Sequence, residues 1–260
     1  MTWARKRAVD VHNETADYFL AEYASQNVHD SPFRYGRALI DEQWKKTVDQ
    51  LPAAAKCVDI GSGIGTYMAR LIAAGFEVLG IEPSAEMRKF ALDQVPTEFI
   101  VDGSVTDLPV DHHSQDFIYA IEVFRYLDAA DNLAGHHEIF RALKPGGVFF
   151  ATYVNKWALD GYRQFVALQK LRDALLGRMP RYHVEFETVS SLRRKLAAAG
   201  FQGIEIRGAM FAPLRPLHKV SPKLATTFSK WTFPRESYLS ERTASRWVAG
   251  HLIAVARRAP

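Results

Sequence analysis

The residues best suited to chemistry cluster in one glycine-rich turn, Asp59-Ile60-Gly61-Ser62-Gly63-Ile64-Gly65. The apolar run at residues 57–60 is typical of a short buried strand, and a helix is expected from about Thr66. Glycines leave the turn without side chains, so a ligand can lie against bare backbone beside the positive end of that helix. Asp59 ends the strand, at the edge where open α/β sheets bind ligands, and its carboxylate favours a ligand that carries a cation.

The glycine spacing separates two classes of cofactor. The dinucleotide fingerprint G-x-G-x-x-G would need a third glycine at position 66, where this chain has Thr66. Glu82 follows the next apolar run, and a carboxylate at that place can accept both hydroxyls of a ribose. Asp59 and Glu82 together therefore predict a ligand with a ribose and an amine, which S-adenosylmethionine satisfies. The alternative is a glycine-rich loop that only turns the chain.

A second kind of chemistry would be proton removal from an acceptor. Methyl transfer from a sulfonium is an in-line displacement that depends on holding the nucleophile about 3 Å from the methyl group. A base is needed only if the acceptor must lose a proton. The candidate bases, on loops beyond the strand ends, are Tyr126, Tyr153 and His183, which has Glu185 nearby. The alternative for His183 is a helix cap or a surface position.

The elements that must position these residues alternate between strand and helix over residues 52–155. This alternation predicts a parallel sheet wound by right-handed crossovers. Strands are expected at 57–60, 77–81, 98–101, 117–121 and 147–153, and the first two helices of this part at about 66–74 and 84–94. The run Leu143-Lys144-Pro145-Gly146-Gly147 is expected to end a helix and turn the chain into the fifth strand.

Both flanks of this core read as mainly helical. Residues 1–51 are expected to form a helical cap, with one helix over 36–51 that turns Leu39, Ile40, Trp44 and Val48 inward. Arg34 precedes that helix, where it can reach a carboxylate of the ligand or remain a solvated loop residue. Beyond the core we expect a helical excursion over 156–190, a helix over 191–199 and strands at 204–206 and 252–256.

The segment 207–246 is strongly basic. Its charged residues are Arg207, Arg215, Lys219, Lys223, Lys230, Arg235, Arg242 and Arg246 against Glu236 and Glu241. Leu224, Phe228 and Trp231 fall on one helical face among them. Three roles stay open: peripheral contact with an anionic membrane, a cap over the active site for an acidic or lipid-linked acceptor, or an insertion that packs Phe228 and Trp231 inward. We expect the segment to help shape the acceptor pocket.

Length and composition predict one large domain or one domain with an elaboration. The net charge of +4 is mildly basic and does not by itself imply nucleic acid. No apolar run reaches the ~18 residues of a spanning helix, and the first ten residues lack an apolar signal core. The single cysteine, Cys57, cannot form an internal disulfide. A cytoplasmic location is therefore expected, while the oligomeric state stays undetermined.

Two pairs of adjacent histidines raise the question of a metal site. His112-His113 and His136-His137 lack the i, i+4 spacing and the nearby cysteines of a zinc site. Both pairs are expected to be solvated, and no metal is expected.

Five motifs in order resemble the class I S-adenosylmethionine-dependent methyltransferase family. They are VDIGSGIG at 58–65, GIEPS at 80–84, DGSVTDLP at 102–109, DFIYAIEV at 116–123 and RALKPGG at 141–147. The resemblance implies a Rossmann-like α/β fold. Its seven-stranded, mostly parallel sheet would have the order 3-2-1-4-5-7-6, with strand seven antiparallel and helices on both faces. A single domain would cover 1–260: the cap at 1–51, a cofactor-binding core at 52–155 and acceptor-side elements at 156–260.

The resemblance also implies a cofactor site along the strand ends. Gly61, Ser62 and Gly63 would lie against the methionine portion of S-adenosylmethionine. Asp59 would hold its amino group, and Glu82 would bind its ribose hydroxyls. The remaining cofactor-binding residues would be Pro83 and Met87 beside the adenine, Ser104 and Val105 at the adenine edge, and the backbone of Ile121 facing the amino acid part.

Within this family the chain is similar to the ubiquinone-biosynthesis O-methyltransferase branch. Ser31-Pro32-Phe33-Arg34 stands where that branch has Asn-Pro-Leu-Arg, which makes Arg34 the candidate partner of the methionine carboxylate. After strand four the branch carries Glu-x-x-Glu-His, whereas this chain has Glu122-Val123-Phe124-Arg125-Tyr126. Tyr126 therefore replaces the histidine and is a candidate catalytic residue together with His183.

The sequence thus predicts an S-adenosylmethionine-dependent methyltransferase for a small-molecule or lipid-linked acceptor, with oxygen as the expected target. An NAD(P)-dependent oxidoreductase is disfavoured by Thr66. A nucleic acid methyltransferase is disfavoured because no Asn/Asp-Pro-Pro-aromatic motif follows strand four. A cofactor-binding protein without catalysis stays open, because intact glycines and acids cannot establish the chemistry.

Overall fold

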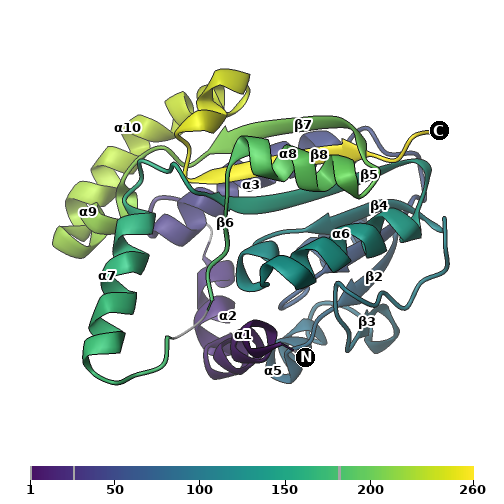
Figure 1. The fold of residues 1–260 in the computed structure, drawn as a ribbon, viewed down its shortest axis with the longest axis horizontal. Coiled ribbons are helices and arrows are strands. Elements are labelled where there is room, and N and C mark those ends of the chain that lie inside the picture. Colours follow the sequence, from purple (N-terminus) through teal and green to yellow (C-terminus); the bar gives the residue numbers. More distant parts are fainter. Residues whose placement is uncertain (1, 26, 181–182) are drawn as a thin grey trace.

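The computed structural model describes residues 2–25, 27–180 and 183–260 (Figure 1). Its strands are β1 (Lys56–Ile60), β2 (Glu77–Ile81), β3 (Ile100–Val101), β4 (Gln115–Ala120), β5 (Leu143–Asn155), β6 (Phe186–Glu187), β7 (Gln202–Ala209) and β8 (His251–Arg257). They form one sheet in the order β3-β2-β1-β4-β5-β8-β7, with β6 paired to the end of β5. β8 runs antiparallel to β5 and β7. Apart from the additional β6, this is the predicted order, and the expected α/β fold is confirmed.

Helices cover both faces of the sheet (Figure 1). They are α1 (Trp3–Glu14), α2 (Ala16–Ala24), α3 (Pro32–Val48), α4 (Thr66–Ala73), α5 (Ala85–Ala91), α6 (Ala129–Ala142), α7 (Tyr162–Leu175), α8 (Val189–Ala198), α9 (Leu214–Val220) and α10 (Pro222–Ser240), with short 3₁₀ turns η1 (Thr97–Phe99), η2 (Phe124–Tyr126) and η3 (Thr243–Trp247). α6 and α8 pack on one face, and α3, α4 and α10 pack on the other. Strand alternation serves both cores: Phe117 and Tyr119 of β4 face the α3 side, whereas Ile118 and Ala120 face the α6 side.

Several predicted boundaries differ from the structure; β5, for example, runs over Leu143–Asn155 where a strand is expected at 147–153. Two of the differences, in α3 and β3, have a clear physical cause. α3 begins at Pro32 because Ser31 Oγ accepts a hydrogen bond from the Arg34 N–H at 3.2 Å and proline suits the first helical position. Arg34 therefore lies in the first turn of a helix and not in a loop. The strand expected at 98–101 is shorter, since η1 takes the first residues and leaves a two-residue β3.

The basic segment 207–246 packs against the core through α10. The Tyr35 hydroxyl of α3 is hydrogen-bonded to the Thr232 hydroxyl at 2.9 Å, and the Phe233 ring lies 5.3 Å from the Tyr35 ring. Phe228 joins the same core, whereas Leu224 and Trp231 are exposed. The apolar face predicted from these three residues is therefore split between core and surface. Within the described residues no helix is long and apolar enough to cross a bilayer.

Candidate active site

A cavity of about 1380 Å³ lies where the carboxyl ends of β1, β2 and β4 meet the N-terminal helices. The register sets this edge, because Ile60 pairs with Ile81 on one side and with Ala120 on the other. The residues that follow the three strands are thus held side by side. The predicted cofactor-binding residues all line this cavity except Arg34.

The turn after β1 has the backbone shape that glycine tolerates best. Gly61 and Gly63 have φ values of 66° and 56°, in the left-handed region. A Cβ on Gly61 would come 2.5 Å from Val123 Cγ2, whereas a Cβ on Gly63 would project into open space. Because Gly63 lines the cavity, that space is available to a ligand lying against the backbone.

Glu82 is buried at the end of β2 and ties the two strand ends together. Its carboxylate accepts hydrogen bonds from the N–H groups of Gly63 at 2.9 Å and Ser84 at 2.7 Å. Burial raises the pKa of Glu82, and these two hydrogen bonds oppose the rise. Each carboxylate oxygen keeps a further lone pair, so a ribose can donate both of its vicinal hydroxyls to this group.

Asp59 is buried at the end of β1 and lines the same wall. Its Oδ2 has no hydrogen-bond partner among the residues that the structure describes. Burial, assisted by the negative charge of Glu82, raises the pKa of Asp59 well above its usual value. A buried carboxyl oxygen without a partner is costly, and a ligand ammonium group has the chemistry to satisfy it.

Pro83, Met87, Ser104 and Val105 form the wall beside Glu82. Met87 packs against Ile64 of the glycine-rich turn. Asp102 and Gly103, which the sequence motifs did not single out as site residues, line the same wall, and Asp102 pairs with Arg88 at 3.2 Å. This apolar slot with a carboxylate at its rim suits a purine base.

Arg37, one helical turn after Arg34, is the α3 arginine that reaches the cavity. Its guanidinium lies over the rings of Tyr23 at 5.1 Å and Tyr67 at 5.3 Å, and it donates to the Tyr67 hydroxyl at 3.3 Å. Arg34 instead donates to the Glu22 carbonyl at 3.0 Å and pairs with Asp30 at 3.4 Å. The family motif indicates Arg34, but in the helix that begins at Pro32 it is Arg37 that lines the cavity.

A histidine and a tyrosine also line this cavity. Tyr126 lies on η2, and the His12 ring of α1 meets it edge-on with centroids 5.1 Å apart. His12 Nδ1 lies 2.7 Å from the Ala8 carbonyl, so Nδ1 carries and donates the proton while Nε2 keeps its lone pair. Burial and the nearby Arg125 charge lower the pKa of His12, which keeps the ring neutral at neutral pH. No sequence motif singled out His12.

A network of charged and polar side chains around Glu122 lies next to Tyr126 in the cavity lining. The Glu122 carboxylate lies 2.5 Å from Arg125 Nη1 and 3.1 Å from His251 Nε2, and it accepts from the Thr152 hydroxyl at 3.0 Å. Burial acts to raise the pKa of Glu122, but His251 and Arg125 together hold it well below its usual value. Arg125 also donates to the Tyr162 hydroxyl. The network joins η2, β8 and α7 into one wall and keeps Glu122 ionised.

His183 lies outside the residues that line the cavity. Its Nε2 pairs with Glu185 Oε2 at 3.2 Å, and the Glu185 N–H donates to the Arg125 carbonyl at 2.8 Å. The sequence predicted both His183 and Tyr126 on loops beyond strand ends, as candidate bases. In the fold the two residues do not line the cavity together.

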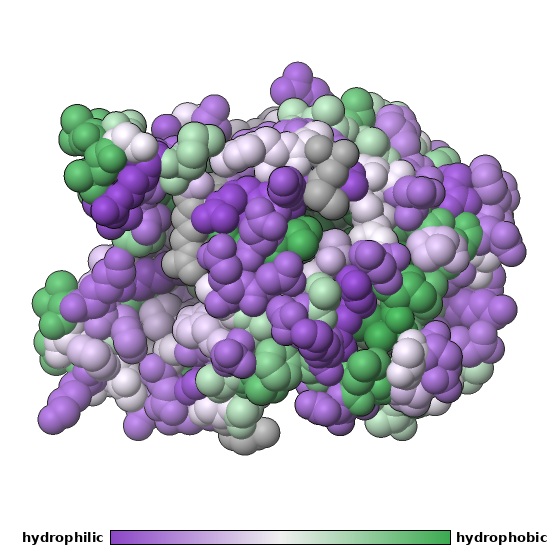
Figure 2. Space-filling view, turned by 90° about the horizontal axis from the view of Figure 1, so that it is seen from below, coloured by the Kyte–Doolittle hydropathy of each residue, from purple (hydrophilic) through white to green (hydrophobic). Residues whose placement is uncertain are grey.

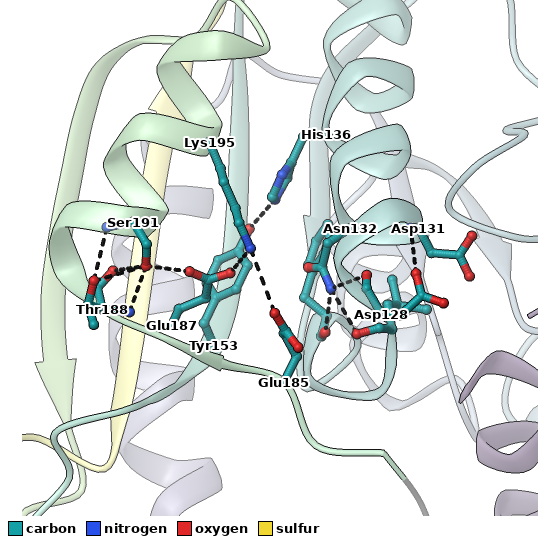
Figure 3. Close-up of polar contacts among 12 residues, drawn as sticks. Asp128, Asp131, Asn132, His136, Tyr153, Glu185, Glu187, Thr188, Ser191 and Lys195 are labelled. Carbon is teal, nitrogen blue, oxygen red and sulfur yellow. Dashed lines mark hydrogen bonds and ion pairs between the residues drawn. The ribbon is translucent and has the colours of Figure 1, made fainter. Parts of the chain in front are cut away.

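Tyr153 is likewise outside the cavity, in a buried polar network between α6 and α8 (Figure 3). His136 Nε2 lies 2.8 Å from the Tyr153 hydroxyl, and Lys195 pairs with Glu187 of β6. Burial raises the pKa of Tyr153 well above its usual value and lowers that of His136 to about 3. His136, expected in water, is thus a core residue bonded to β5, while Lys195 fastens β6 to α8.

Comparison with known proteins agrees with this arrangement. Residues 58–151 match the model of a methyltransferase domain family. An uncharacterised methyltransferase of Mycobacterium tuberculosis is 32% identical over 98 residues, which are 37% of this chain and 39% of that protein. The chain therefore matches about two fifths of that relative's length.

Two solved structures share the fold. Phosphoethanolamine N-methyltransferase 2 of Haemonchus contortus, with phosphomonomethylethanolamine and S-adenosylhomocysteine bound, is 14% identical with a TM-score of 0.65, over 100% of this chain and 61% of that chain. Magnesium protoporphyrin IX methyltransferase of Synechocystis, with S-adenosylhomocysteine bound, is 14% identical with a TM-score of 0.62, over 98% and 100%. The domain match and the fold support S-adenosylmethionine as the cofactor.

Proposed function

We propose, from the methyltransferase domain that residues 58–151 match, that this protein transfers a methyl group from S-adenosylmethionine to an oxygen atom of a small-molecule or lipid-linked acceptor. One observation carries the proposal: a single cavity joins the wall of Asp59, Gly63 and Glu82 to the pair of His12 and Tyr126. Ligand pockets usually measure up to about 1000 Å³. A cavity of about 1380 Å³ therefore has room for a cofactor and an acceptor.

The cavity wall that contains Asp59, Gly63 and Glu82 would hold the cofactor. When bound, S-adenosylmethionine supplies a methyl group that its sulfonium already activates. Asp59 would pair with the ammonium group, Arg37 with the carboxylate, and Glu82 with the ribose hydroxyls. What remains for the protein is to orient the acceptor oxygen in line, about 3 Å from the methyl carbon.

His12 would accept the proton that an acceptor hydroxyl loses. The Ala8 carbonyl fixes the tautomer, so the lone pair is on Nε2, and the lowered pKa keeps the ring unprotonated. Tyr126 meets the ring edge-on and would orient the acceptor. A base of this kind suits a hydroxyl acceptor, because a neutral amine already offers its lone pair.

The acceptor itself must be inferred from this chain. The Haemonchus and Synechocystis proteins share the fold although one is named for phosphoethanolamine and the other for a magnesium porphyrin. The likeness to the ubiquinone-biosynthesis branch stays a prediction, because its histidine is Tyr126 here and its motif arginine, Arg34, pairs with Asp30 outside the cavity lining.

The cofactor assignment is tested by calorimetric titration with S-adenosylhomocysteine and, separately, with NADH. Wild-type protein is expected to bind S-adenosylhomocysteine, and Glu82→Gln to weaken that binding by about 1–3 kcal/mol, because a charged hydrogen-bond acceptor is lost. Glu86→Gln on α5 is the matched control and should leave the affinity unchanged. Binding of NADH alone would overturn the proposal, as would binding of neither ligand.

The catalytic assignment is tested by transfer of label from S-adenosylmethionine to fractions of a cell extract. With the labelled acceptor isolated, His12→Gln is expected to lower kcat by about 10²–10⁴-fold and to abolish the acid limb of the pH profile. That limb should lie below about pH 6.5, because the pKa of His12 is lowered from the ordinary value. His112→Gln serves as the control. An unchanged profile in His12→Gln would contradict the assignment of His12 as the base.

A further inference from the structure

Helix α7 carries a row of leucines that no other element of the described residues covers. Leu168, Leu171 and Leu175 leave 66%, 58% and 79% of their surface exposed. They follow one another at spacings of three and four residues and therefore share one helix face. Leu176 and Met179 continue the exposed apolar surface beyond the end of α7. Exposed apolar patches of this extent mark interaction sites more often than ordinary surface.

A second exposed apolar group lies at the corner between α9 and α10. Val220 leaves 83% of its surface exposed and Leu224 60%. The two groups belong to one end of the molecule, because the Lys219 ammonium of α9 lies 3.7 Å from the centre of the Phe165 ring of α7. Figure 1 shows α7 and α9 at the same end, and Figure 2 shows hydrophobic side chains on two protrusions there with a hollow between them.

The exposed charged residues that α7 and α9 themselves carry are basic. The exposed residues of α7 and the turn after it include Arg163, Lys170, Arg172 and Arg178. The one acid of α7, Asp173, is buried and paired with Arg172. Residues 214–231 contain Arg215, Lys219, Lys223 and Lys230 and no acid. A surface of exposed leucines with basic residues between them matches an anionic bilayer in both apolar and electrostatic terms. A second copy of this chain is a less suitable partner, because it would bring the same positive charges against this surface.

The same two helices, α7 and α9, contribute to the lining of the cavity. Tyr162 and Phe165 at the start of α7, and His218 and Lys219 of α9, line the cavity. The leucines one and two turns farther along α7 are exposed to solvent. An acceptor held at the bilayer surface would therefore meet the cavity without first crossing water.

We propose that α7 and the α9–α10 corner form a docking surface for membranes that contain anionic phospholipid. Leu168, Leu171, Leu175, Val220 and Leu224 would enter the bilayer interface, while the basic residues contact lipid headgroups. The surface differs from the one that the basic segment alone predicted, because its longest apolar row lies on α7. Docking does not require the proposed methyl transfer, so each proposal can be tested and overturned independently of the other.

The experiment is flotation of purified protein with vesicles of phosphatidylcholine alone and with added phosphatidylglycerol. Wild-type protein is expected to float with the anionic vesicles and to be released as salt rises. Leu168→Glu/Leu175→Glu is expected to weaken binding by about tenfold or more for each leucine. Lys170→Gln/Arg178→Gln is expected to weaken it by about fivefold for each cation. Leu133→Glu, an exposed leucine on α6, is the matched control.

Binding of S-adenosylhomocysteine, measured on each variant, confirms that the fold is intact, since none of these residues lines the cavity. Failure of wild-type protein to float with anionic vesicles would overturn the proposal. Equal flotation of wild type and Leu168→Glu/Leu175→Glu would also overturn it. So would a wild-type dimer, seen by light scattering, that dissociates in this variant without any vesicle binding.

Discussion

At the residue scale, the Asp59 carboxyl group is expected to help bind the cofactor while lowering the stability of the ligand-free protein. Its raised pKa means that the folded, ligand-free protein holds a proton that the unfolded chain releases near pH 4. Stability from this group is thus present below the unfolded pKa and is lost as pH rises through the folded pKa. At about pH 7.5 Asp59→Asn should therefore raise the free energy of unfolding without ligand, while weakening S-adenosylhomocysteine binding by about 10–100-fold. Denaturant titration and calorimetry measure both, with exposed Asp93→Asn as the control; a less stable Asp59→Asn protein would contradict the account.

Arg37 and Arg34 offer a matched comparison on one helix. Arg37→Gln should weaken binding of S-adenosylhomocysteine by about 1.5–3 kcal/mol, because a charged hydrogen bond to the ligand carboxylate is lost. Arg34 pairs with Asp30 and Glu22 and does not itself line the cavity, so the affinity of Arg34→Gln for the ligand should stay within about threefold of wild type. Calorimetry on the two variants decides whether Arg37 or Arg34 binds the ligand carboxylate. The reverse result would restore the sequence-based choice of Arg34.

At the element scale, α3 holds the wall that carries Arg37. Its inner face contains Leu39, Ile40 and Trp44, as the helical spacing predicted, and the Trp44 ring meets the Tyr67 ring at 4.9 Å and the Tyr119 ring at 5.7 Å. Trp44→Ala should lower the free energy of unfolding by about 3–5 kcal/mol, because it leaves a cavity between helix and sheet. Exposed Lys45→Ala on the same helix should change it by less than about 1 kcal/mol. Chemical denaturation measures both, and a loss below 1 kcal/mol in Trp44→Ala would show that α3 is not packed as described.

At the scale of the whole molecule, the N-terminal helices α1 and α2 line one side of the cavity. Hydrogen bonds hold α1 to the core. The Ser84 hydroxyl donates to Asn13 Oδ1 at 2.6 Å, and Arg5 donates to the Thr106 hydroxyl at 2.9 Å. A ligand that contacts both α1–α2 and the strand ends should stabilise the packing of these helices against the core. We expect S-adenosylhomocysteine at 100 times its Kd to slow amide exchange in residues 3–24 by up to about 100-fold. Exchange in α8 serves as the reference, and equal protection of both regions would indicate only global stabilisation.

The sequence by itself determined the features that depend on local pattern. Apolar runs at strand spacing, separated by helical segments, predicted the sheet, and the family motifs predicted its order. The glycines after β1 and the acids after β1 and β2 could be recognised because each lies within a few residues of a strand end. Pattern alone did not determine the start of α3, where the Ser31 cap and Pro32 act together, nor the length of β3.

Only the tertiary structure decided which distant residues share the cavity. His12, Arg37 and His251 come from three different parts of the chain, and nothing in their neighbours along the sequence indicates that they line one site. His136 sits on a helix face that looked polar, but its ring packs against Phe124 and against Phe149 and Tyr153 of β5, so its burial depends on long-range packing. The leucines of α7 could equally have filled a core, and they are exposed because no element packs over that face in the described chain. Such facts follow from long-range packing, which local spacing does not encode.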